Sequence, residues 1–350
     1  MSSEITLYTS SYGHIVALVS GESFRWARTA LQLAGFEKDS DGNYVVPLID
    51  TARARQALAA LTETSRSCQS TVTAADQRYI GDFALGVSRH LPGQWKVRVE
   101  NYAHPAAQGD LFSCLWTTGS NLRYLENRRI PAAAVIQAED GAEIAIVYNP
   151  RHRVYDVGML VPTDMYLDES VTPPPMITVH PATVPAARKI ASTLLTDYHR
   201  ALFEMQLNHL GDDLAWAQEE FEPGTVQDPP QRDLAEAFER FASIAPHIIT
   251  ALRTSDAHAV NAHEQAFLED MGAAFSQPGA GAEEAGETRE NPSLDLLSMW
   301  MSEGEGLVEL ARDAVRTAPA QTALGLVRAV GAPGALPSPP PRVGAALNRR

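Results

Sequence analysis

The sequence is poor in the residues that mark a disulfide scaffold, a metal centre or a membrane protein. It has only two cysteines among 350 residues, Cys68 and Cys114, and neither has a companion at the spacing of a metal site. We therefore expect both to be buried free thiols. No stretch approaches about 18 uninterrupted apolar residues, so we predict neither a transmembrane helix nor a membrane partner. The first residues lack the basic and apolar segments of a secretory signal, which favours a cytoplasmic protein.

Sequence signatures for nucleotide phosphates, metal ions and covalent catalysis are missing as well. The chain contains no GxGxxG or GxxxxGK[ST] loop, no GxSxG nucleophile elbow and no HExxH helix. We therefore expect no cofactor and no metal, and the absences favour a protein without catalysis. The alternative is an orphan hydrolase-type enzyme whose polar residues meet only in the fold, for instance Tyr12, His14 and His152.

The charge of the chain is strongly acidic and unevenly distributed. Acidic residues outnumber basic ones 43 to 28, which gives a formal net charge of -15 and argues against a protein that coats nucleic acid. Residues 1–163 hold 15 basic and 16 acidic side chains, whereas residues 164–350 hold 13 basic and 27 acidic ones. The acidity therefore belongs to the C-terminal part, and a local basic site in the N-terminal part stays open.

Residues 1–92 have the alternating pattern of a small α/β unit. Short β-branched runs separated by turn residues predict strands, and apolar residues at intervals of three and four predict two helices between them. Gly35 stands where a helix-ending glycine belongs, and Asp50 or Thr51 can cap the second helix. The expected elements are strands at 4–9, 14–19, 44–48 and 68–73 and helices at 24–34 and 52–61.

Residues 93–182 form the next segment, for which we predict a β-rich meander. Trp95, Val97 and Val99 alternate with charged residues, as in a strand with one wet face. Three further runs are joined by short turns and predict an antiparallel meander. These runs are 133–138, 142–148 and 154–161. The prolines within 168–182 mark a crossing segment, where regular structure cannot continue.

The remainder of the chain has helical periodicity and polar interruptions. We predict a helical region at 183–275, a linker at 276–292, a helical segment at 293–330 and a disordered tail at 331–350. Together with the two N-terminal segments, this order predicts an α+β protein: an N-terminal α/β unit, an antiparallel meander sheet and a helical C-terminal region.

Several strings of the N-terminal segments occur together in a group of known sequences. Ala34-Gly35-Phe36 precedes Asp41-Gly42-Asn43-Tyr44 and Pro47, and Pro131-Ala132-Ala133-Ala134-Val135 precedes Asp140-Gly141. Over roughly residues 30–210, the chain resembles uncharacterised actinobacterial proteins. Its three lysines against 25 arginines agree with a high-GC genome. No activity is assigned to those proteins, so the resemblance implies no catalytic residue.

Two basic clusters in the β-rich segment are candidates for a local nucleic-acid contact. Guanidinium groups at a hairpin tip can bind phosphates in bidentate fashion, and several aromatic residues lie in the same segment. The usual explanation of such clusters is a solvated loop. The candidate residues are Arg123, Arg128 and Arg129 before one strand and Arg151, His152 and Arg153 at a predicted hairpin tip.

The helical segment at 293–330 carries a second candidate surface. Met299, Trp300 and Met301 are adaptable contact residues that could dock a partner protein, and packing within the chain is the competing explanation. From these patterns we predict a soluble cytoplasmic protein-interaction or regulatory protein without catalysis, whose partner is another protein or a second copy of itself.

Overall fold

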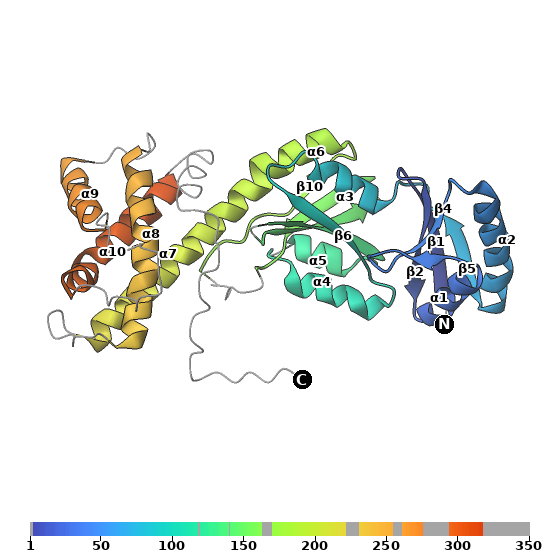
Figure 1. Cartoon of the computed structure of the whole chain (residues 1–350), viewed down its shortest axis with the longest axis horizontal. Helices are drawn as coiled ribbons and strands as arrows, with labels where there is room; N and C mark the ends of the chain where they lie inside the picture. The colour runs from blue at the N-terminus through green and yellow to red at the C-terminus, as the bar shows by residue number, and fades with distance from the viewer. Residues whose placement is uncertain are drawn as a thin grey trace, which may run out of the picture. The chain divides into compact units, whose positions relative to one another are not determined.

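The computed structural model describes residues 3–117, 120–139, 141–162, 170–221, 231–254, 261–275 and 294–317 (Figure 1). The chain divides into two compact units. Met1–Thr163 and Pro173–Tyr198 form the first, which we call the α/β unit, and Asp164–Thr172 and His199–Arg350 form the second, which we call the helical unit. The predicted α+β class is confirmed, because two sheets precede a series of helices. The predicted boundaries at residues 92 and 182 stay predictions.

The first sheet is mixed, with strand order β3-β4-β2-β1-β5. Its strands are β1 (Ser3–Ser10), β2 (His14–Gly21), β3 (Glu37–Lys38), β4 (Tyr44–Pro47) and β5 (Ser70–Ala74). β5 runs parallel to β1, and the other neighbours are antiparallel. Helices α1 (Phe24–Leu33) and α2 (Thr51–Ser67) pack on this sheet, so that Ile5, Leu31 and Leu61 meet in one core.

Local sequence signals explain where these helices begin and end. The Asp50 side chain accepts a hydrogen bond of 2.9 Å from the Arg53 amide, which caps α2 as expected. Gly35 has a φ of +84° just after α1, a conformation that favours glycine. Both cysteines are free thiols, as predicted, but neither is fully buried: Cys68 is half-buried, and Cys114 is exposed at the end of a short helix.

The second sheet is an antiparallel meander with strand order β10-β9-β8-β7-β6. Its strands are β6 (Trp95–Asn101), β7 (Ala132–Ala138), β8 (Glu143–Asn149), β9 (Val154–Met159) and β10 (Ile177–Val179). The three-stranded meander predicted from the sequence is confirmed as β7, β8 and β9. The short strand β10 comes from the proline-containing segment, where the sequence predicted no regular structure.

Short helices interrupt the two N-terminal segments at places where the sequence predicted none. They are α3 (Ile80–Ser88), η1 (Pro105–Ala107), α4 (Gln108–Cys114) and α5 (Ser120–Glu126). Each of these helices spans fewer than three turns, which is too short for a periodic apolar pattern to stand out. α3 packs against β6, β7 and β8, while its Asp82 accepts a hydrogen bond of 2.7 Å from Ser10 in β1. α3 therefore connects the two sheets.

Buried tyrosines line the contact between α3 and the sheets. Phe83 of α3 stacks on Tyr155 of β9 with ring centroids 3.7 Å apart, and Tyr8 of β1 lies 6.0 Å from Tyr79. Burial raises the pKa of Tyr8 to about 12, although a hydrogen bond with Gln77 opposes this shift. Burial also raises the pKa of Tyr155 to about 12.

We expect the α/β unit to lose stability between about pH 10 and pH 12 because of these tyrosines. In this window an unfolded tyrosine loses its proton while Tyr8 and Tyr155 keep theirs, so the unfolded state becomes favoured as the pH rises. The Tyr155→Phe variant should reduce this loss by roughly 1 kcal/mol per pH unit. Urea unfolding at pH 7, 10 and 11.5 measures it. Equal slopes in both proteins would contradict the expectation.

A series of helices follows β10. It contains α6 (Thr183–Lys189), a π-helical turn η2 (Ile190–Leu194), α7 (Leu195–Glu220), α8 (Arg232–Thr254), α9 (Ala262–Phe275) and α10 (Leu294–Thr317). α8 continues through Pro246, although proline inside a helix removes a backbone hydrogen bond and commonly kinks or ends the helix. The predicted linker and disordered tail lie outside the described residues, as do residues 318–330 of the predicted C-terminal helical segment.

The helical unit has a core of its own, in which α10 packs on α8 and α9. Trp300 of α10 is fully buried, and its ring lies 5.8 Å from Phe238 and 6.0 Å from Phe241 of α8. Across the part of the chain that the structure describes, no helix combines the length and the apolar character needed to span a membrane.

Candidate functional site

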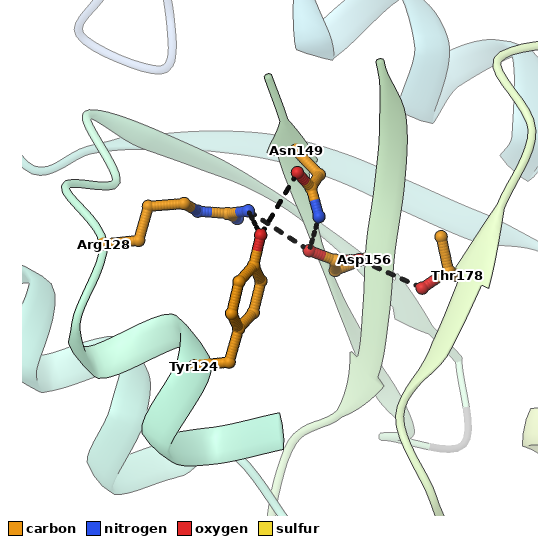
Figure 2. Close-up of polar contacts among 5 residues, drawn as sticks. All are labelled: Tyr124, Arg128, Asn149, Asp156 and Thr178. Atoms are coloured by element: carbon orange, nitrogen blue, oxygen red, sulfur yellow. Dashed lines mark hydrogen bonds and ion pairs between the residues drawn. The ribbon is translucent and has the colours of Figure 1, made fainter. Parts of the chain in front are cut away.

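A buried carboxylate on β9 is the centre of a polar cluster in the α/β unit. Only 8% of Asp156 is exposed, and three side chains donate hydrogen bonds to its carboxylate (Figure 2). Asn149 Nδ2 and Arg128 Nη1 donate to Oδ2 over 3.0 and 3.3 Å, and Thr178 Oγ1 donates to Oδ1 over 3.1 Å. A buried charge is tolerated only when it is paired in this way.

Tyr124 closes the cluster on the side of α5. Its hydroxyl donates to Asn149 Oδ1 over 3.3 Å and accepts from Arg128 Nη1 over 3.4 Å. The Arg128 guanidinium carbon also lies 5.3 Å from the centroid of the Tyr124 ring, within the range of a cation–π contact. Tyr124 therefore positions both Arg128 and Asn149, and Figure 2 shows the three side chains converging on Asp156.

The rigid sheet sets the positions of the remaining members. Asp156 lies opposite Thr178 in the β9–β10 pair, and the two side chains therefore meet across adjacent strands. Asn149 is the last residue of β8, pairs with Val154 at the start of β9 and is itself buried. Because β8, β9 and β10 are neighbours in one sheet, Asn149, Asp156 and Thr178 are held on one scaffold.

Arg128 has hydrogen-bonding capacity left over. Its Nε and Nη2 atoms are buried, and neither has a hydrogen-bond partner among the residues that the structure describes. A buried guanidinium N–H without an acceptor costs free energy, so such atoms mark a place where a water molecule or a ligand atom is expected.

A small cavity of about 190 Å³ adjoins this cluster, and we call it the Asp156 cavity. Its lining combines four polar side chains of the cluster, all except Arg128, with three apolar residues and with His152 from the β8–β9 turn. The lining residues are Tyr124, Leu125, Asn149, His152, Asp156, Met176, Ile177 and Thr178. Small-molecule sites commonly have this composition, in which a few convergent polar groups are set among apolar ones.

The structure separates the first basic cluster that the sequence indicated. Arg128 pairs with Asp156, and only 15% of its side chain is exposed, so it does not lie on an open basic surface. Arg129 donates to the backbone carbonyls of Tyr102, Ala103 and Ile130, and burial lowers its pKa. Both arginines stabilise the loop before β7. For Arg128 this corrects the expectation that it faces a phosphate backbone, whereas Arg129 is exposed and stays a candidate. Arg123 lies exposed on α5.

The second basic cluster is exposed at the turn between β8 and β9, where the sequence predicted a hairpin tip. Arg153 forms an ion pair of 3.4 Å with Asp76, but both side chains are largely exposed, so the pair contributes little stability. His152 reaches the Asp156 cavity, and Arg151 and Arg153 flank it in the chain. The nucleic-acid contact stays a prediction, confined to this turn and the exposed Arg123 and Arg129.

The predicted docking residues belong to the core of the helical unit. Trp300 is 0% exposed and Met301 is 1% exposed, while Met299 packs against the same core and is partly buried. This corrects the expectation of an accessible docking surface. The three residues are consecutive in α10, and Trp300 and Met301 belong to the buried core, because the unit needs large apolar side chains to fill its interior.

The residues considered for an enzyme do not gather at this cavity. Tyr12 and His14 belong to the β1–β2 hairpin of the first sheet, with 46% of Tyr12 exposed, whereas His152 is on the second sheet. Of the three, His152 alone lines the Asp156 cavity. Among the described residues, no group of three or more His, Cys, Asp or Glu side chains is arranged to hold a metal ion.

Comparison of the chain with known protein families, with curated proteins and with solved structures finds no match. The function must therefore be argued from the geometry of the site. Sequence reasoning missed Tyr124, Asn149, Asp156 and Thr178. The available signal was Asp156, the single charged residue in the apolar strand 154–161, since an acid in such a strand needs a partner.

Proposed function

We propose that the protein is a regulatory binding protein without catalysis, whose α/β unit recognises a small polar ligand in the Asp156 cavity. The observation that carries the proposal is the Asp156 cluster itself, in which a buried carboxylate is neutralised by Arg128 and oriented by Asn149 and Thr178. A preformed cluster of this kind lowers the cost of binding, because its groups are already ordered and desolvated.

The hydrogen bonds that Asp156 already accepts support a binding role in preference to acid–base catalysis. A general base needs a carboxylate that can accept a proton from the substrate, whereas the Asp156 oxygens already accept three hydrogen bonds. The carboxylate therefore acts as an anchor that holds Arg128, Asn149 and Thr178 in place. The hydrolase alternative would require turnover of a ligand at the same cavity.

The distribution of charge around the cavity indicates the chemical class of the ligand. Asp156 and Asn149 line the cavity, and their oxygens can accept hydrogen bonds beyond those they already receive, which suits a ligand hydroxyl or amino group. The turn beside it carries His152 with Arg151 and Arg153, which suit a carboxylate or phosphate. We therefore propose a small hydroxy acid, amino acid or phosphomonoester, because a cavity of about 190 Å³ holds only a few heavy atoms.

Calorimetric titration of the full chain with glycolate, serine and glycerol 3-phosphate tests this function. We expect at least one probe to bind and to be recovered unchanged, and we expect His152→Ala to weaken its binding about tenfold by removing one polar contact. Because His152 is exposed, the variant should unfold at the same urea concentration as the wild type.

Arg123→Ala is the matched control, since it removes an exposed basic side chain on α5 that does not line the cavity. It should bind the probe like the wild type. The absence of binding at millimolar concentrations of all three probes would contradict the proposal, and so would equal affinities of the His152→Ala variant and the wild type.

We also propose that the protein works in a reducing compartment such as the cytoplasm. Support comes from Cys68 and Cys114, which both remain free thiols although one of them is exposed.

A further inference from the structure

The outer edge of β5 differs from the other sheet edges that the structure describes. β3 has two residues, β10 has three, and β6 carries Lys96, Arg98 and Glu100. Short length and charge are the devices by which proteins prevent an edge strand from pairing with another chain. β5 has neither device, because its five residues lie within Cys68–Ala75, a run of eight uncharged residues without proline.

The ladder geometry shows which backbone groups of β5 face outward. The Ala75 amide donates to the Leu7 carbonyl of β1 over 2.8 Å, so Ala75, Thr73 and Thr71 direct their backbone groups toward β1. Ser70, Val72 and Ala74 alternate with them and direct theirs away. Within the described part of the chain, those three residues have no backbone hydrogen-bond partner on that side. The edge thus offers three unpaired N–H and C=O groups.

We propose that β5 pairs antiparallel with β5 of a second copy of this chain and so joins two first sheets into one. A two-fold axis at Val72 places Val72 opposite its own copy and Thr71 opposite Thr73, with no like charges facing each other. The strand is self-complementary in this register because both copies present the same alternation of outward backbone groups. A charged partner strand would find no opposite charge on this edge.

The length of the edge sets the strength of this dimer. A ladder of five residues buries a small area compared with stable interfaces, so the dimer forms weakly and depends on concentration. Its amides have a distinctive signature: Val72 and Ala74 gain protection from hydrogen exchange only in the dimer, whereas Thr73 is protected by β1 at every concentration.

Two substitutions test the pairing by different means. Val72→Pro removes the central outward N–H and leaves the bonds to β1, because the Val72 amide does not donate to β1. Thr71→Glu places two carboxylates diagonally across the two-fold axis, about 7–8 Å apart, where they repel. Thr62→Glu introduces the same charge on the exposed side of α2 and is the matched control.

The experiment is light scattering and amide exchange of the full chain up to about 1 mM. We expect the mass of the wild type and of Thr62→Glu to rise from 37.9 kDa toward twice that value, and both β5 variants to dissociate at least tenfold more readily. A wild type that stays monomeric throughout would overturn the proposal. A dimer that persists in Thr71→Glu and Val72→Pro, or one that leaves the Val72 amide unprotected, would overturn it as well.

Discussion

Replacing Asp156 with alanine should lower the free energy of unfolding of the α/β unit by about 3–5 kcal/mol. The side chains of Asp156 and Arg128 are 11% and 15% exposed, and their ion pair is part of a buried network. Removal of the carboxylate leaves the Arg128 guanidinium buried without its counter-charge and removes the acceptor of Asn149 and Thr178. Urea unfolding of the full chain, followed by the signal of the sheets, measures the loss.

Two further variants separate the lost charge from the lost packing. Asp156→Asn keeps the shape of the side chain and should cost less than alanine, since the amide oxygen still accepts a hydrogen bond. The double variant Asp156→Leu with Arg128→Met removes both charges and should recover most of the stability, because apolar side chains often replace a buried ion pair without loss. If the double variant were as unstable as Asp156→Ala, the ion pair would not explain the effect.

Replacing Trp300 with alanine should lower the free energy of unfolding of the helical unit by about 3–5 kcal/mol. The Trp300 side chain is 0% exposed, and it packs between α8 and α10 against Phe238 and Phe241. Its removal leaves a cavity that the surrounding aromatic rings cannot fill. Thermal or urea unfolding followed by helical circular dichroism measures the change.

Trp300→Phe is the matched control for this variant. The indole Nε1 is buried without a hydrogen-bond partner among the described residues, so phenylalanine removes an unsatisfied donor while it keeps one aromatic ring. We expect Trp300→Phe to cost much less than Trp300→Ala. Equal losses would contradict the role of ring packing. A loss below about 1 kcal/mol for alanine would show that Trp300 faces solvent, as the sequence-based docking hypothesis requires.

The meander and the long helices could be predicted because their patterns are local and long. β7, β8 and β9 are runs of six or seven residues that are apolar or alternate between apolar and polar, and turn residues flank them. α7 and α10 place apolar residues at helical intervals over many turns. The short helices α4 and α5 could not be predicted, because their seven residues contain too few apolar positions to define a face.

The candidate site was only partly visible in the sequence. Arg128 and His152 were chosen for their charge, and both belong to the Asp156 cluster or its cavity. Their partners come from α5, β8, β9 and β10, so that Tyr124 and Thr178 lie 54 positions apart in the chain and line one cavity. The spacing of these residues along the sequence does not reveal that they line one cavity, because the order of strands in the sheet places them together.

By itself the sequence determined the class of fold, the uneven charge and most of the strands and helices, since these follow from side-chain periodicity and turn chemistry. The tertiary structure alone decided which charges are buried and which are exposed. It paired Arg128 with Asp156, placed Arg129 on backbone carbonyls and buried Trp300, because a charged or aromatic side chain takes its role from the neighbours that packing supplies. It also left the uncharged edge of β5 unpaired, which follows from the order of the strands and not from their composition.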